Sequence, residues 1–356
     1  MTGRAGLTKT AVVALALGAG VATPALADPF TIQLQQNFAL EFAVLGQFSN
    51  NQTNYNNGNI IGDIGIGTPR EFTISNANLD GDVRFSGASS TAGFQTTTAC
   101  TFNGNSGFKN SGGGCFTGSI IANDPQVAQA LNFVNSLSLT LGQEAGTVVA
   151  ITGTQTINAS SGILDANGNR IFTASVSGFT NSEVLTINGS ASDYVVLNIS
   201  ANAQFSGRIV LTGGITQDQV LINMYGGCYV LDNTPSCDQA SELYKGGPTL
   251  QVNTNFSGNG ASTFGIFLDP NGAMSANNTD IRGRFFGGDV TNQQIVSGAN
   301  ITTTSLQPDC IDCDVVPEPA TMALLGTGLL GLALVGWRRP RRRRSGKGAA
   351  GGHEAV

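Results

Sequence analysis

The chain of 356 residues is acidic, with a formal net charge of −6 and an isoelectric point near 4.7. Such a charge makes nucleic acid and anionic membrane surfaces poor partners. The only histidine is His353, close to the C-terminus, so Ser-His-Asp catalysis, Cys-His catalysis and His-based zinc chemistry are excluded from the rest of the chain.

The first 27 residues have the features of a secretory signal peptide. Arg4 and Lys9 precede an apolar stretch, which ends in small residues. The pattern Ala25-Leu26-Ala27 predicts cleavage by signal peptidase after Ala27, so that the mature chain begins at Asp28. We therefore expect everything from Asp28 to about Glu318 to be exported.

Residues 28–305 are predicted to form one all-β exported domain. Apolar and small polar residues alternate there in short runs, as in half-buried strands, and each run is bounded by Gly, Asn or Asp, which tolerate turns with positive φ. The segments expected to contain strands are 58–67, 77–87, 146–160, 192–200, 203–214, 262–272 and 279–291. From Asp28 to Glu318 there are twenty-two Asp and Glu against eight Lys and Arg, a net charge of −14. This charge suits cationic partners, although solubility outside the cell explains it equally simply.

One segment departs from the strand pattern and is predicted to be a helix over about 124–143. Asp124 is a suitable N-cap, Pro125 suits the first helical position and Gly146 is a stop signal. Three- and four-residue spacings give one apolar stripe that can lie along a sheet, formed by Val127, Ala130, Leu131, Val134, Leu137 and Leu141. Short strand-turn units beside a single long helix favour an irregular β-solenoid with a flanking α-helix over a β-sandwich.

All the cysteines lie in the exported part, where disulfides persist: Cys100, Cys115, Cys228, Cys237, Cys310 and Cys313. Proximity in the sequence favours pairing of Cys100 with Cys115 and of Cys228 with Cys237. Cys310 and Cys313 have the C-x-x-C spacing of a redox pair or of half a zinc site. Because no exported histidine or second C-x-x-C completes a metal site, we favour a local disulfide for this pair.

No metal, cofactor or catalytic site is predicted in the exported domain. Asp80 with Asp82, and Asp165 with Asn167 and Asn169, offer oxygen atoms at the alternate positions that calcium uses. The second group lacks the glutamate that an EF-hand has at its twelfth position, and Asp and Asn beside Gly are ordinary turn residues. A glycosidase needs a pair of positioned carboxylates, and nothing in the sequence singles out a pair, so we expect no enzymatic activity.

The C-terminal region is predicted to be a linker, 306–319, a transmembrane helix, 320–337, and a basic cytoplasmic tail, 338–356. The apolar run contains no charge and, at a rise of about 1.5 Å per residue, extends over about 27 Å, close to the hydrocarbon thickness of a bilayer. A buried core helix is the alternative, but its glycines would weaken such a helix in water. Positive charge keeps the following tail in the cytoplasm, and it is supplied by Arg338, Arg339, Arg341, Arg342, Arg343 and Arg344.

The order of Pro317-Glu318-Pro319, the apolar span and the arginine cluster resembles the PEP-CTERM sorting signal of Gram-negative bacteria. This resemblance implies that an exosortase, a membrane protease with transpeptidase-like activity, processes the chain near Pro317, Glu318 and Pro319. The precursor would then be tethered to the inner membrane, and the product would reach the cell surface or the extracellular space. The segment after the arginines is longer than such signals usually carry.

The segments 38–67, 191–227 and 265–290, with the helix between the first two, resemble the choice-of-anchor A family and ice-binding-like adhesin domains. Both resemblances imply a right-handed β-helix of uneven coils with a flanking α-helix on a secreted or surface-attached protein. Neither supplies catalytic residues.

Two functions fit these observations. The first is a non-enzymatic structural or adhesive protein of the extracellular matrix or biofilm, with polysaccharide or matrix proteins as partners. The second is a specific binding module for glycans or ice, for which Thr152, Thr154 and Thr156 would form a row on one face of a strand.

Processing at both ends can be tested by mass spectrometry of the mature protein. We expect an N-terminus at Asp28, and a C-terminus near Pro317-Glu318-Pro319 in cells that have the sorting protease. In cells without it, the chain should extend to Val356 and fractionate with membranes. Recovery of a cytosolic chain with both termini intact would contradict the predicted export.

Overall fold

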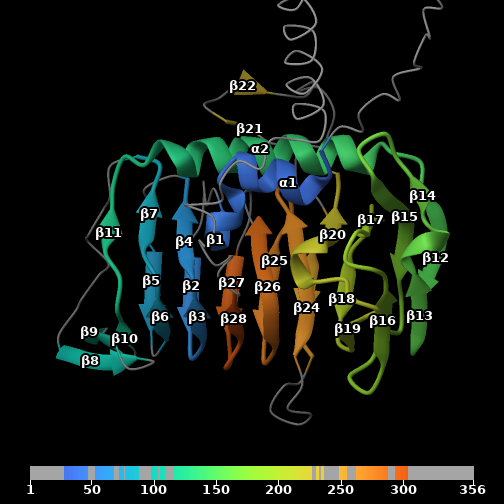
Figure 1. Cartoon of the computed structure of the whole chain (residues 1–356). Helices are drawn as coiled ribbons and strands as arrows, with labels where there is room; N and C mark the ends of the chain where they lie inside the picture. Colours follow the sequence, from blue (N-terminus) through green and yellow to red (C-terminus); the bar gives the residue numbers. More distant parts are fainter. Residues whose placement is uncertain are drawn as a thin grey trace, which may run out of the picture. The chain divides into compact units, whose positions relative to one another are not determined.

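The computed structural model describes residues 28–46, 53–67, 72–75, 77–87, 98–102, 105–109, 115–226, 230–231, 234–235, 248–254, 262–287 and 293–303. Short strands stack mainly in parallel into a β-helix with a long helix along one side (Figure 1). The predicted all-β class and flanking helix are confirmed, whereas the right hand of the coil stays a prediction. The described residues all belong to one compact unit of the chain, which ends at Thr304.

The strands form three larger sheets and one hairpin. Sheet A consists of β1 (Phe42–Gly46), β3 (Asn59–Ile61), β4 (Asp63–Ile66), β6 (Asn78–Asp80), β7 (Val83–Phe85), β8 (Thr98–Phe102), β9 (Asn105–Lys109), β10 (Cys115–Phe116), β11 (Ile120–Ile121), β12 (Thr147–Ile151), β14 (Ile163–Leu164), β15 (Asn169–Val176), β17 (Tyr194–Ile199), β20 (Val220–Met224), β24 (Thr263–Asp269), β26 (Asp280–Gly287) and β28 (Asn300–Thr302). Sheet B consists of β18 (Ala203–Phe205), β23 (Leu250–Val252), β25 (Met274–Asn277), β27 (Gln293–Val296), β2 (Thr53–Asn56) and β5 (Phe72–Ser75). Sheet C consists of β13 (Gln155–Asn158), β16 (Val184–Asn188) and β19 (Arg208–Thr212), and the hairpin of β21 (Val230–Leu231) and β22 (Thr234–Pro235).

The coils do not stack in the order of the sequence. β1 starts in the middle of sheet A, and the chain proceeds through β4 and β7 to β11 at one end. Helix α2 (Pro125–Gly142) follows, and β12 begins the other end, from which the strands return through β15, β17, β20 and β24 to β26 (Figure 1). β26 then pairs with β1, so the first and last coils of the chain close the β-helix against each other.

Three parallel pairings close the β-helix, because each of the last three strands, β26, β27 and β28, pairs with one of the first three, β1, β2 and β3. Leu45 of β1 lies opposite Phe286 of β26, and β27 pairs with β2 in sheet B. β28 lies between β26 and β3, with Ile301 opposite Ile281 on one side and Ile60 on the other. These isoleucines are buried, so the junction is part of the interior of the β-helix.

The length of α2 matches the part of the sheet that it covers. Eighteen residues rise about 27 Å, and the six strand spacings from β7 to β17 extend about 29 Å. Arg84 of β7 donates to Asp124 at the start of the helix at 2.6 Å, and Asn198 of β17 donates to the carbonyl of Leu141 at its end at 2.5 Å. The helix is therefore attached at both ends to the strands that it spans.

The predicted helix and its N-terminal cap are confirmed. The Asp124 side chain accepts from the backbone N–H of Gln126, and Pro125 occupies the first turn, while the helix ends at Gly142, before the predicted stop at Gly146. All six residues of the predicted apolar stripe are buried. A second helix, α1 (Phe30–Gln36), was not predicted; its Phe30 and Leu34 pack with the stripe in a cluster between the helices and sheet A. The other helical turns among the described residues are 3₁₀ helices at Ala39–Glu41, Ala159–Ser161 and Gln217–Gln219.

Polar side chains also hold α2 to the sheet. Ser138 donates to Asn223 at 2.7 Å, and Asn223 donates to Asn198 on the neighbouring strand at 2.8 Å and to the backbone of Ser138 at 3.0 Å. All three side chains are buried. Since buried amides are costly unless paired, these bonds favour one position of the helix along the strands.

Glycines occupy corners where adjacent coils come close together. Gly283 has φ of +146°, and a Cβ built on it would lie 2.0 Å from the carbonyl oxygen of Gly265 on the next coil. Any larger residue at this corner would have to displace backbone.

Gly283→Ala tests this constraint. We expect it to lower the free energy of unfolding by about 3 kcal/mol or more, because backbone strain adds to a clash. Gly178→Ala is the matched control: φ is +69° and open space surrounds the position, so strain alone should cost about 1 kcal/mol. Urea denaturation of both variants measures the difference, and equal losses would show that coil contact is unimportant.

Several predicted segments lie outside the described residues. These are the signal peptide 1–27, the linker 306–319, the transmembrane helix 320–337 and the basic tail 338–356. Within the part of the chain that the structure describes, no helix has the length and apolar character needed to cross a membrane.

Candidate functional site

The outer surfaces of the three sheets differ in how they are covered. The strands of sheet A between β7 and β17 carry α2, with α1 packed in the same apolar cluster. Sheets B and C have exposed positions along their outer sides, such as Gln204, Gln251 and Thr212. Sheets B and C are therefore the candidate binding surfaces.

The outer face of sheet B carries no charge. Its six strands contain neither acidic nor basic residues, although the exported part is strongly acidic. Parallel register aligns Gln204 of β18, Gln251 of β23, Ser275 of β25 and Gln294 of β27 in one row across four strands. Each of these residues is exposed or half-buried, whereas their neighbours in the strands are buried. The row is a run of hydroxyl and amide groups at spacings of about 4.8 Å.

Two depressions adjoin this row at strand β18. One, of about 560 Å³, is lined by Gly178, Phe179, Thr180, Asn181, Ser182, Gln204 and Ser206. The other, of about 380 Å³, is lined by Val176, Ser177, Gly178, Asn202, Ala203, Gln204, Thr249 and Gln251. Both include Gly178 and Gln204, and neither is lined by an ionisable side chain. A general acid or base for bond cleavage is therefore lacking among the lining residues.

Sheet C has a smaller polar face. Thr156, Thr186 and Val210 form one register row, and Asn158, Asn188 and Thr212 form the next. In the second row, Thr212 donates to Asn188 at 3.1 Å and Asn188 donates to Asn158 at 2.9 Å.

The predicted threonine row was wrong in its geometry. Thr152 and Thr154 lie between β12 and β13, where the chain turns from sheet A to sheet C, and only Thr156 is in a strand. Thr154 accepts a hydrogen bond from the backbone of Val184 at 3.1 Å. Threonine recurs at every second position of this segment, but the segment includes a corner of the coil. Residues at every second position share one face only within a strand.

An asparagine ladder lies on the outer side of sheet A near the chain closure. Asn78 donates to Asn59 at 2.6 Å, and Asn59 donates to Asn300 at 2.7 Å. The three residues come from β6, β3 and β28, the last of which arrives from the far end of the sequence. The ladder thus joins the first and last coils through side chains as well as backbone.

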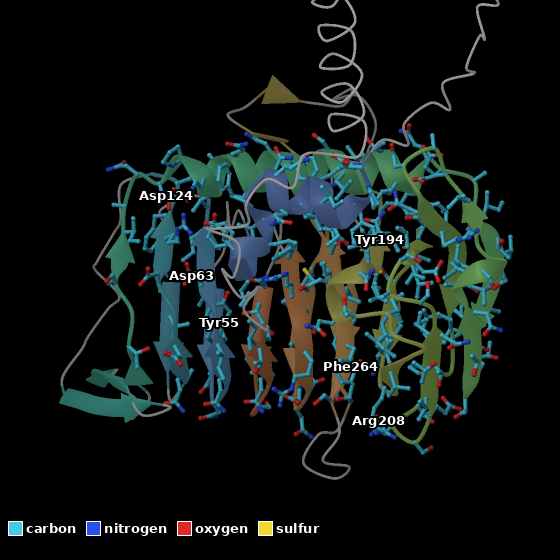
Figure 2. All side chains as sticks on the ribbon, viewed as in Figure 1. Tyr55, Asp63, Asp124, Tyr194, Arg208 and Phe264 are labelled. Atoms are coloured by element: carbon cyan, nitrogen blue, oxygen red, sulfur yellow. The ribbon has the colours of Figure 1, made fainter. Side chains whose placement is uncertain are left out.

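Among the described residues, a group of ionisable side chains surrounds Arg84, where α2 begins. Figure 2 labels Asp63 and Asp124 of this group. Arg84 contacts Asp124 at 2.6 Å, Glu41 at 2.7 Å and Asp63 at 3.5 Å, and its guanidinium lies 4.9 Å from the ring centroid of Phe42. Burial opposes the charge of Arg84, but its bonds to Asp124 and Glu41 outweigh burial and raise its pKa. Each carboxylate shares this one cation, so the cluster acts as a structural cross-link between α2 and the coils.

The pKa of Asp63 is raised, chiefly by burial and further by the nearby charge of Asp82, against lowering by the Asp82 backbone N–H and by Arg84. Because the carboxyl pKa is raised in the folded state, stability falls as the pH rises above the ordinary carboxyl pKa, and the loss is complete once the pH exceeds the raised pKa. Below the ordinary carboxyl pKa of about 4, Asp63 is protonated in both states and imposes no such cost.

Asp63→Asn should therefore stabilise the protein at neutral pH by up to about 1 kcal/mol, with the gain disappearing below about pH 4. The asparagine oxygen can still accept the Asp82 N–H. Asp193→Asn is a control of opposite sign, because bonds from Ser190 lower the pKa of Asp193. That variant should lose stability at neutral pH and approach the parent as acid protonates Asp193. Urea denaturation measures the free energy of unfolding of each variant against pH. If the difference from the parent had the same sign and pH dependence in both variants, both assignments would be wrong.

The oxygen-rich groups considered for calcium make local bonds. Asp165 accepts from the backbone N–H groups of Asn167 and Asn169 at 2.8 and 2.7 Å and from the Asn169 amide at 2.8 Å. The interpretation as turn residues is confirmed for this group. Asp80 accepts from Thr117 at 2.6 Å, and Asp82 accepts from the backbone of Ser119 at 2.7 Å. Among the described residues, no group of acidic, cysteine or histidine side chains could hold a metal ion.

The predicted cysteine and processing sites are for the most part not described. The backbones of Cys100 and Cys115 lie in β8 and β10, on either side of β9. Both disulfide assignments stay predictions, as does the Cys310–Cys313 pair. Outside the described residues are Cys228, Cys237, Cys310, Cys313, Ala27, Pro317, Glu318, Pro319, Arg338, Arg339, Arg341, Arg342, Arg343 and Arg344, while Asp28 is the first described residue.

Comparison with known proteins supports the sorting motif. Residues 315–343 match the family model of the PEP-CTERM protein-sorting motif, which implies an exported surface protein sorted by an exosortase. No curated protein matches the chain. The chain is thus an exported β-helical protein with a PEP-CTERM signal.

Among solved structures, the ice-binding protein of an Antarctic ascomycete, Antarctomyces psychrotrophicus, is 15% identical over 74% of this chain and 95% of its own, with a TM-score of 0.40. The glycosylated ice-binding protein LeIBP of an Arctic yeast is 16% identical over 74% and 91%, with a TM-score of 0.41. An ice-binding protein of an Antarctic Flavobacteriaceae bacterium is 15% identical over 74% and 45%, with a TM-score of 0.37.

Proposed function

We propose that the exported body is a non-enzymatic binding protein of the extracellular matrix, and that the outer face of sheet B with its two depressions holds a neutral polysaccharide. The observation that carries this proposal is the absence of charge from all six strands of sheet B. In a body with a net charge of −14, such a face is the region where an uncharged polymer need not displace ordered counterions or desolvate a charge.

The polar groups of the face suit sugar hydroxyls. Gln204 and Gln251 lie side by side in register and belong to the depression at β18. Each amide has two donors and an acceptor, the combination that hydroxyl groups can satisfy. The long glutamine side chains can adapt to a polymer of variable conformation, whereas they would lose considerable rotamer entropy on a rigid lattice. These properties favour a soluble glycan chain over ice on this face.

The double substitution Gln204→Ala and Gln251→Ala tests the proposal. Retention by the neutral fraction of the extracellular polysaccharide, measured by affinity electrophoresis, should weaken about tenfold, because two exposed hydrogen-bonding groups are lost. The matched control is Thr186→Ala with Thr212→Ala on sheet C, which should leave retention unchanged. The anionic fraction should not retain the parent protein. Equal retention of both double variants, or no retention of the parent by the neutral fraction, would refute the assignment.

Ice is a second candidate because of the two register rows on sheet C. Thr156 and Thr186 are adjacent in one row, and hydrogen bonds fix the amides of Asn158 and Asn188 in the next. Rigid, evenly spaced groups of this kind can match a lattice, although three strands offer a small area. Thermal hysteresis that is lost in the Thr186 and Thr212 variant and retained in the glutamine variant would favour ice over polysaccharide.

A further inference from the structure

The large apolar side chains that remain exposed in the described part of the chain lie at the two ends of the β-helix. Val148 is 84% exposed, Ile163 47% and Leu164 49%, and Ile121 is 37% exposed. The first three belong to β12 and β14 at one end, and Ile121 belongs to β11 at the other (Figure 1). The apolar exposure is therefore confined to the terminal coils.

Strand β12 is an open edge. It pairs with β15 on one side, as β14 does, and no described strand pairs with its other side, where the Gln155 side chain donates to the carbonyl of Ala150 at 3.1 Å. Its sequence, Thr-Val-Val-Ala-Ile, contains no proline and no charge. Soluble proteins usually protect such an edge with lysine, proline or a bulge. The lack of these devices on a strand rich in β-branched residues indicates an edge that another strand pairs with.

The strand at the opposite end of the β-helix, β11, runs in the same direction as β12. β11 pairs in parallel with β7, and no other described strand contacts its outer side through backbone pairing. Every step of the pairing between β11 and β12 through sheet A is parallel. The two free edges therefore run in the same direction and face opposite ways along the stack.

Register links the exposed residues of the two ends. One row of Cα partners passes without interruption through ten strands: Ile121, Arg84, Gly65, Leu45, Phe286, Leu268, Asn223, Asn198, Thr173 and Val148. Helix α2 covers the middle of this row from Arg84 to Asn198. Ile121 and Val148 lie beyond the helix ends, on the same side of the sheet. A second copy placed end to end would bring its Ile121 beside Val148 and continue both the row and the backbone ladder.

We propose that the exported body associates head to tail with further copies of itself, through parallel pairing of the β12 edge of one copy with the β11 edge of the next. Such a contact uses two different surfaces, so it leaves one open edge at each end of a dimer and extends into filaments. Because each copy carries the same negative charge, repulsion opposes the contact, and added salt should strengthen it. This inference does not depend on the ligand of sheet B.

Sedimentation and electron microscopy of the full chain in detergent test the proposal. The parent should form a concentration-dependent series of linear oligomers, larger at high salt. Val148→Lys and Ile121→Lys should each abolish growth beyond the monomer, with affinity weakened at least about tenfold. Thr212→Lys, an exposed strand position on sheet C, is the control and should leave the series unchanged. Circular dichroism and thermal unfolding must show all variants folded.

Mixing the two variants separates head-to-tail pairing from its alternatives. Val148→Lys retains an intact β11 end and Ile121→Lys an intact β12 end, so their mixture should form dimers that grow no further. If Ile121→Lys dimerised alone, β12 would pair with itself across a two-fold axis and the proposal would be wrong. A parent that stayed monomeric at the highest attainable concentration, with and without salt, would also overturn it.

Discussion

The fold depends on in-register parallel pairing between the first and last coils of the chain. β1 can lie between β4 and β26 only if residues more than 200 positions apart meet with their buried side chains aligned. A shift of one residue would exchange the inward and outward side chains of a strand, placing Phe286 and Leu45 in the interior of the β-helix and turning their neighbours Val44 and Phe285 toward α2. The asparagine ladder and the buried isoleucines of β28 favour the observed register on the same coil. The length of α2 depends on this pairing, because the helix spans the strands from β7 to β17 and the β1–β26 pair lies between them.

The parts of the fold that depend on local chemistry could be predicted from the sequence. The helix was recognised from Asp124, Pro125 and an apolar stripe, all within one segment, and the structure retains each of them. Glycine and alternating apolar residues located many of the strands, although corners at Gly62 and Gly81 divide two predicted segments into pairs of strands. The short α1 was missed because it has no side-chain cap and is stabilised by contacts with distant residues.

The order of the coils and the candidate surfaces could not be predicted in this way. Nothing within β1 or β26 indicates that they are neighbours, because their pairing is set by the whole stack. The row through Gln204, Gln251 and Ser275 comes from strands of three or four residues, too short for periodicity to distinguish an outward position. The threonine row failed for the related reason that alternation does not reveal a corner. The lack of charged residues in the strands of sheet B marks its outer face. This feature can be recognised only after strands from distant segments have been assigned to one sheet.

The position of β28 between β26 and β3 determines when the body can finish folding during export. Export directed by the predicted signal peptide would deliver the N-terminal coils first, and β3 would lack its neighbour on one side until residues 300–302 had crossed. The body therefore cannot complete its hydrogen bonding during translocation, whatever the speed of the earlier coils. Its final strand ends at Thr302, and the sorting motif follows at 315–343. A retained C-terminal segment would hold the chain at the membrane while the last coil inserts, so that maturation of the body and departure from the membrane become separate events.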